Sequence, residues 1–314
     1  MFRKRFSGGL AVAVGAVLTA GTMVSACDSP SGPGASIPET FREAIYYQRF
    51  DAASGLVQVF SVLSTGADER RVAPVAGTQT HPALSPDGRT MAFRSTHEGF
   101  PALYLIAPGD TSPRLLTDLG SPFAPAWSPD GQAIAFSAWQ NGVLDIYSVA
   151  ADGSGVTRLT DTPDLDFSPV WSPDGTVIAY TVDEGSGPQS IHVMSADGSN
   201  QRALVQGPLE PGESLSSPTW SPDGLRIAFV HSGNTPVSIH TMTADGENRQ
   251  PLAIPPITVR AYTWPVWSPD GARIAFVAIG DGTSASLLTV TLADSVVATI
   301  AAVDGISSSP FWAR

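Results

Sequence analysis

One short line recurs five times along the chain, and it limits the fold more than any other feature. It reads Pro-x-Trp-Ser-Pro-Asp-Gly in four copies and Pro-Ala-Leu-Ser-Pro-Asp-Gly in the first, and each copy runs into an Ile-Ala-Phe-like strand. Successive turn glycines are 43, 44, 49 and 47 residues apart, at Gly88, Gly131, Gly175, Gly224 and Gly271. A period in the forties, built from strand-rich units, indicates a β-propeller.

Turn signals divide each unit into four short strands. Between residues 124 and 161 we expect strands at 125–127, 133–138, 143–149 and 156–160, separated by Ser-Pro-Asp-Gly, Gln-Asn-Gly and Asp-Gly. In the first turn, proline presets φ, aspartate bonds its own backbone, and glycine takes the left-handed conformation that closes a hairpin. Such a unit forms one four-stranded antiparallel blade.

The repeated tryptophans and aspartates are interpreted as structural. A tryptophan before each turn supplies a large apolar area for burial between adjacent blades. The aspartates hold the turns. These residues are Trp127, Trp171, Trp220, Trp267 and Trp312, together with Asp87, Asp130, Asp174, Asp223 and Asp270.

The two ends of the repeat region complement each other. Residues 44–48, 56–62 and 70–73 match the second, third and fourth strands of a unit whose first strand is missing. That strand reappears at residues 309–314, where Trp312 follows Trp267 by 45 residues. We therefore expect an all-β, six-bladed propeller closed by pairing of the C-terminal strand with the N-terminal blade, which hides both sheet edges.

These units resemble the TolB-type propeller repeat, which carries the same Trp-Ser-Pro-Asp-Gly followed by Ile-Ala-Phe. The resemblance covers roughly residues 43–314 and implies the six-bladed fold. It says little about function, because this propeller serves many unrelated proteins. TolB itself has a globular domain before its propeller, and none fits here, so TolB's own role is not transferred.

The amino-terminal segment resembles a bacterial lipoprotein signal. A basic opening at residues 3–5 and an apolar stretch at 8–24 precede Val24-Ser-Ala-Cys27. The resemblance implies a signal peptide over 1–26, lipidation of Cys27, a flexible tether over 27–40 and a propeller over 41–314. Ordinary signal cleavage at the same point, or an uncleaved membrane helix, are the alternatives. Cys27 is the only cysteine in the chain, so no disulfide forms within it.

The net charge limits the classes of molecule that the protein can bind. The formal net charge is −12; cleavage before Cys27 removes three basic residues and no acidic one, leaving 14 Arg against 29 Asp and Glu, or −15. The remaining chain has no lysine. This composition argues against nucleic acid and anionic lipid surfaces as partners, and it excludes a lysine nucleophile or a Gly-x-x-x-x-Gly-Lys phosphate loop.

Functional residues are expected on one face. Four antiparallel strands place the Ser-Pro-Asp-Gly and Ala-Asp-Gly turns on one side, here called the turn face. The loops between second and third strands, and the linkers between blades, lie on the other, the variable face. Binding residues tend to occupy variable loops over a rigid frame. The candidates are the aromatic and basic residues Trp264, Tyr262, Arg260 and Trp139, and the acidic group Asp161, Asp164, Asp166, Asp183, Glu184, Glu210 and Glu213.

The acidic group can receive a basic partner, bind calcium through oxygen ligands, or form a solvated surface. No spacing of histidines suggests zinc, and no Gly-x-Ser-x-Gly is present. We expect a non-catalytic, lipid-anchored propeller in the bacterial cell envelope that binds another envelope protein, with no cofactor other than a possible calcium ion, and that is monomeric.

The alternatives are a glycan lyase or hydrolase with its site at the channel mouth, and a glycan-binding module that uses Trp264 and Trp139. The enzyme would draw on Asp164, Asp166, Glu213, His81, Arg260 and Tyr262.

Overall fold

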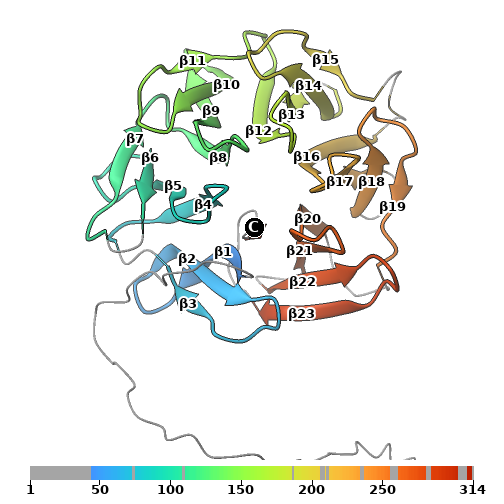
Figure 1. The fold of residues 1–314 in the computed structure, drawn as a ribbon, viewed down its shortest axis with the longest axis horizontal. Helices are drawn as coiled ribbons and strands as arrows, with labels where there is room; N and C mark the ends of the chain where they lie inside the picture. Colours follow the sequence, from blue (N-terminus) through green and yellow to red (C-terminus); the bar gives the residue numbers. More distant parts are fainter. Residues whose placement is uncertain are drawn as a thin grey trace, which may run out of the picture. The chain divides into compact units, whose positions relative to one another are not determined.

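Six antiparallel sheets of four strands each are arranged around a central axis, as Figure 1 shows. The computed structural model describes residues 44–72, 75–107, 110–185, 187–205, 209, 212–233, 237–254, 261–280, 284–302 and 310–312. Within them the chain contains strands and turns and no helix. The predicted six-bladed β-propeller is confirmed.

Blade 1 contains β24, β1, β2 and β3, and blades 2 to 6 follow in chain order with four strands each. The strands are β1 (Ala44–Asp51), β2 (Leu56–Leu63), β3 (Arg70–Arg71), β4 (Gln79–Leu84), β5 (Met91–Ser95), β6 (Ala102–Ile106), β7 (Arg114–Thr117), β8 (Phe123–Trp127), β9 (Ala133–Gln140), β10 (Val143–Ala150), β11 (Thr157–Arg158), β12 (Leu165–Trp171), β13 (Val177–Asp183), β14 (Ser190–Ser195), β15 (Arg202–Ala203), β16 (Ser214–Trp220), β17 (Arg226–Ser232), β18 (Ser238–Thr243), β19 (Gln250–Pro251), β20 (Ala261–Trp267), β21 (Arg273–Ile279), β22 (Ala285–Thr291), β23 (Val297–Ala302) and β24 (Phe311–Trp312).

The second strand of each blade is buried on both faces because a neighbouring blade covers each side. In β9, Ile134 through Ala138 are all fully buried. Six apolar clusters result, one at each junction between consecutive blades. The core of this fold is therefore a ring of sheet-to-sheet contacts.

The ring closes as the sequence predicted. In blade 1, β24 pairs antiparallel with β1, with Trp312 opposite Ile45 and Phe311 opposite Tyr46. The cluster at the junction of blades 6 and 1 joins Ile45 and Tyr47 to Trp312 and to residues of β21 and β22. The last strand is thus both an edge partner of β1 and part of the core.

The Ser-Pro-Asp-Gly turn has the predicted mechanism. In blade 3, the Ser128 hydroxyl donates to Asp130 Oδ1 at 2.6 Å, and the backbone N–H of Gln132 donates to the same oxygen at 3.0 Å. The N–H of Ala133 donates back to Ser128 Oγ at 2.9 Å, and Gly131 has φ +71°. The bond from the Ser128 hydroxyl, followed by that from the backbone, lowers the pKa of Asp130.

The repeated tryptophans are buried to different degrees. Trp220, Trp267 and Trp312 are buried, as predicted, whereas Trp127 and Trp171 are half-buried. The residue two places after the turn glycine of the preceding blade adds cover over the two most deeply buried rings, Trp267 and Trp312. It is Arg226 over the Trp267 ring and Arg273 over the Trp312 ring, at 4.6 and 4.9 Å from the centroids, and Val177 packs with Trp220. The equivalent residues for Trp127 and Trp171 are Thr90 and Ala133, both shorter than arginine.

Candidate functional site

Each innermost strand from blade 2 to blade 6 carries a bulge at the residue before its proline. The hydrogen-bond register shifts there, and the residue takes a left-handed backbone that is uncommon for any residue except glycine. The five residues are His81 (φ +53°), Ala124 (φ +50°), Ser168 (φ +56°), Ser217 (φ +54°) and Trp264 (φ +49°).

Side chains of the preceding blade hold several of these bulges. The backbone N–H of His81 donates to Gln48 Oε1 at 2.9 Å, and that of Ser168 donates to Ser137 Oγ at 3.1 Å. The N–H of Ser217 donates to Thr181 Oγ1 at 3.1 Å. Each bond ties an innermost strand to the neighbouring sheet, and the bulge residues then form part of the wall of the central channel.

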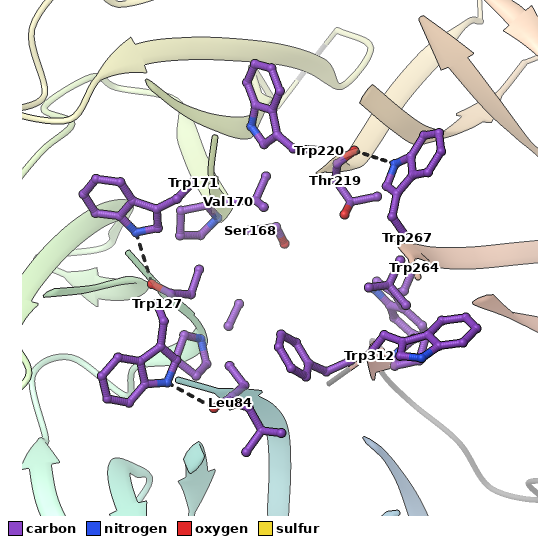
Figure 2. Close-up of a pocket in the computed structure, with 18 of the residues that line it drawn as sticks. Leu84, Trp127, Ser168, Val170, Trp171, Thr219, Trp220, Trp264, Trp267 and Trp312 are labelled. Atoms are coloured by element: carbon purple, nitrogen blue, oxygen red, sulfur yellow. Dashed lines mark hydrogen bonds between the residues drawn. The ribbon is translucent and has the colours of Figure 1, made fainter. Parts of the chain in front are cut away.

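The channel encloses a cavity of about 220 Å³. Its wall runs from the bulge residues toward the prolines of the turn face, and it is built mainly of proline and tryptophan. Figure 2 shows the repeated tryptophans around this cavity with their indoles directed outward; these are Trp127, Trp171, Trp220, Trp267 and Trp312. Three indole N–H groups donate to carbonyls of the preceding blade, from Trp127 to Ala83 at 3.1 Å, from Trp171 to Ala126 at 3.2 Å and from Trp267 to Thr219 at 3.2 Å.

Among the described residues that line the cavity, His81 is the single titratable side chain. Its ring lies 5.7 Å from that of Phe123. Burial, followed by the nearby guanidinium of Arg94, lowers the pKa of His81 to about 4, so the imidazole is neutral at neutral pH. General acid–base chemistry commonly uses an acid and a base placed together. The described wall offers a single such group, His81.

Three exposed aromatic residues lie on the variable face of consecutive blades. Phe50 at the end of β1 is 48% exposed, Phe100 in the loop after β5 is 45% exposed, and Trp139 in β9 is 43% exposed. They are the exposed aromatic side chains of the part of the chain that the structure describes. Phe50 and Trp139 occupy the same position of their blades, three residues after Tyr47 and Phe136. We call these three residues the aromatic arc.

Sequence reasoning singled out Trp139 but missed Phe50. Aligning Tyr47 with the phenylalanine of the Ile-Ala-Phe strands would have placed Phe50 beside Trp139 in the repeat. Trp139 is held by a close backbone contact in which its N–H donates to the Gly120 carbonyl at 2.8 Å. A Cβ atom at Gly120 would lie 1.8 Å from the Trp139 carbonyl oxygen, so only glycine fits there.

Two of the acidic candidates are not surface residues, which corrects the expectation of an accessible acidic group that includes them. Asp166 is 1% exposed and Glu213 is 9% exposed. Asp166 accepts from the Thr162 hydroxyl at 3.1 Å. Glu213 lies 2.6 Å from Arg249 and 3.2 Å from His231, whose ring stacks on His240 at 4.2 Å. Asp166 lies within β12 opposite Val182, and Glu213 is paired with Arg249 and His231, contacts between distant segments that residue type alone does not show.

The remaining candidates are dispersed. Trp264 is half-buried, lines the channel cavity and packs on the cluster between blades 6 and 1. Tyr262 is half-buried with its ring edge-on to Phe276 at 5.5 Å, and burial raises its pKa. Asp164 is half-exposed in the linker before β12. Cys27, Glu210 and Arg260 lie outside the described residues.

The residues that an enzyme would use are therefore spread over separate blades, with His81 in blade 2, Asp164 and Asp166 at blade 4, Glu213 at blade 5 and Tyr262 in blade 6. No group of three or more His, Cys, Asp or Glu side chains suited to a metal ion occurs within the described ranges. Nor do those ranges contain a helix long and apolar enough to cross a membrane.

Comparison with known proteins agrees with this architecture. A family model described as the TolB beta propeller domain matches residues 117–314. TolB from Acinetobacter baumannii is 22% identical with a TM-score of 0.74, covering 88% of this chain and 68% of that one. A structure described as putative TolB from Agrobacterium tumefaciens is 23% identical with a TM-score of 0.67, covering 87% and 94%.

A manganese-bound oligogalacturonate lyase shares 13% identity and a TM-score of 0.59, covering 83% and 74%. No curated protein sequence matched the chain. At these identities the structural likeness concerns the fold. Because the family model spans more than half of the sequence, the chain belongs to the family of TolB β-propeller domains.

Proposed function

We propose that this protein is a non-catalytic propeller of the bacterial cell envelope, held by a lipid on Cys27, that binds another envelope protein through its variable face. The observation that carries the proposal is the aromatic arc. Phe50, Phe100 and Trp139 project from consecutive blades on the face whose loops differ in length and chemistry. Large aromatic side chains supply much of the binding energy in protein interfaces.

The surroundings of the arc indicate the chemistry of the partner. Glu98, in the loop that carries Phe100, has a side chain that is 52% exposed. Asp161, in a linker on the same face, is 83% exposed and pairs with Arg158. The mature chain would carry a formal charge of −15. A protein surface that presents apolar side chains among basic ones would complement this face in both respects.

The channel wall supports the non-catalytic part of the proposal. Among the described residues, its proline and tryptophan lining with one neutral histidine gives a substrate neither a nucleophile with its base nor a pair of carboxylates. The separate positions of Asp166, Glu213 and Tyr262 likewise disfavour the glycan lyase or hydrolase.

Cross-linking in native membranes tests the binding face. We expect wild-type protein to capture a defined partner, and the triple variant Phe50→Ala/Phe100→Ala/Trp139→Ala to reduce that capture at least about tenfold, because aromatic anchors dominate interface energy. Leu115→Ala/Leu225→Ala is the matched control, since both leucines are exposed but lie away from the arc. Equal capture by wild type and triple variant would refute the face assignment, and turnover of a glycan by the purified protein would refute the non-catalytic assignment.

Membrane fractionation tests the anchor separately. Cys27→Ser removes the thiol that would carry the lipid, and a chain with no acyl group loses about 0.8 kcal/mol of membrane affinity per buried methylene. We expect the variant to move from the membrane pellet to the soluble fraction, while its propeller melts at the wild-type temperature. Wild-type protein in the soluble fraction, or Cys27→Ser still in the pellet after a carbonate wash, would contradict lipid anchoring.

A further inference from the structure

Two buried carboxylates lie at the junction where blade 3 passes into blade 4. Asp145 in β10 is 0% exposed, and Asp166 in β12 is 1% exposed. In each of them the Oδ1 oxygen is buried and has no hydrogen-bond partner. A buried charged oxygen without a hydrogen-bond donor is costly, so the carboxylate oxygens at this junction need more donors than it provides.

The donors at the junction are too few for its oxygens. Arg158 donates through Nε and a terminal nitrogen to one oxygen of Asp145, Oδ2, at 3.1 and 2.7 Å, and it also pairs with Asp161 at 2.5 Å. The Thr162 hydroxyl donates to Asp166 Oδ2. The Thr160 hydroxyl adjoins both buried carboxylates, but it has a single proton. One arginine and two hydroxyls therefore face several carboxylates.

Blade 1 builds the same junction from neutral amides. Arg71 pairs opposite Phe60 as Arg158 pairs opposite Tyr147, so Gln58 occupies the position of Asp145. Gln79, three residues before Pro82, occupies the position of Asp166, three residues before Pro169.

The amide groups supply donors that carboxylates lack. Gln58 accepts from Arg71 at 2.5 Å and donates to the Gly77 carbonyl at 2.8 Å, while Gln79 donates to the Val75 carbonyl at 2.9 Å. Both glutamines are fully buried. The fold therefore accepts a neutral pair at this position, and the two carboxylates of blade 3 and blade 4 are not required to build the junction.

We propose that Asp145 and Asp166 bind a calcium ion between blades 3 and 4. The groups available are all hard oxygens, namely the two orphan Oδ1 atoms and the hydroxyls of Thr160 and Thr162, which suit calcium rather than a softer metal. Two carboxylates, rather than the three or more of a high-affinity site, place the expected Kd in the range of about 0.1–1 mM that extracellular calcium modules use.

A proton shared by Asp145 and Asp166 is the alternative way to neutralise the buried negative charge. Burial, with smaller contributions from Asp145 and Asp164, raises the pKa of Asp166 to about 6, against opposing hydrogen bonds from Thr160 and Thr162. A carboxyl whose folded-state pKa is raised stabilises the fold at acidic pH, and that stabilisation is lost as pH rises from about 4 through about 6.

Unfolding of the full-length protein at pH 7.5, with calcium varied at constant ionic strength, tests the site. At calcium ten times above Kd, the folding equilibrium constant of wild type should rise about tenfold. The variant Asp145→Gln/Asp166→Gln, which transplants the amide pair of blade 1, should fold and show no calcium response. Asp166→Asn alone serves if the double variant does not fold, and magnesium at the same concentration is the ion control.

The outcomes separate the two explanations. Calcium stabilisation of wild type that is lost in the amide variant, with equilibrium dialysis showing one bound ion, supports the site. A calcium-insensitive wild type that gains stability between pH 7 and pH 5, a gain absent in Asp166→Asn, would show a proton and overturn the proposal. An equal response of wild type and amide variant to calcium would overturn it as well.

Discussion

Trp267→Ala is expected to lower the free energy of unfolding by about 3–5 kcal/mol, the usual cost of removing a large buried aromatic side chain. Trp267 is 4% exposed, donates to the Thr219 carbonyl of blade 5 at 3.2 Å and lies under the Arg226 guanidinium at 4.6 Å. Alanine leaves a cavity between two sheets and an unpaired carbonyl. Equilibrium unfolding in urea measures the loss.

Trp171→Ala is the matched control for that experiment. Trp171 makes the equivalent bond to Ala126 at 3.2 Å, but it is half-buried. The position that Arg226 occupies beside Trp267 is occupied here by Ala133. Its removal exposes less new cavity surface, so the loss should be clearly smaller. Equal losses at the two positions would contradict the role given to Arg226 and to burial.

Removal of residues 309–314 should abolish cooperative folding of the whole propeller. The deletion takes away β24, which pairs with β1, and Trp312, which is 3% exposed in the cluster between blades 6 and 1. An edge of β1 and an apolar face of two blades then meet water. We expect early melting, with binding of a hydrophobic dye, by calorimetry and fluorescence.

A variant with a deletion within residues 28–33, in the expected tether, controls for shortening the chain. Its melting temperature should equal that of the wild type. A truncated protein lacking 309–314 that also melted at the wild-type temperature would show that closure by β24 does not hold the ring together.

The parts of the fold that were predicted from the sequence are those built from a repeated local motif. Ser-Pro-Asp-Gly requires one turn geometry wherever it occurs, and five copies fixed the blades and their order. Closure of the ring by the C-terminal strand was predicted from the repeat spacing. Trp312 continues the spacing of the tryptophans, and the first unit lacks its first strand.

Other features depend on contacts between distant segments. The residue before proline is normally extended, so the left-handed bulge at Trp264 could not be read from Trp-Pro. Contacts with the neighbouring sheet accompany such bulges: Trp264 packs on the cluster between blades 6 and 1, and the N–H of Ser217 donates to Thr181 of blade 4. Asp166 is buried within β12, where it pairs with Val182, and Phe50 is exposed at the end of β1, where it pairs with Val57. Residue type identified Trp139, Asp166 and Glu213 as notable without saying which of them reach the surface.

Strand β24 also sets the order of events while the chain is being made. In five of the six inter-blade clusters every buried member precedes position 310, so these clusters can form as the chain emerges, but the cluster that joins blades 6 and 1 needs Trp312. Until that residue emerges, the nascent protein presents the unpaired backbone of β1 and the side chains of Ile45 and Tyr47 to any neighbouring chain. The period just before the final strand arrives is therefore when this protein is most exposed to aggregation and most in need of a chaperone.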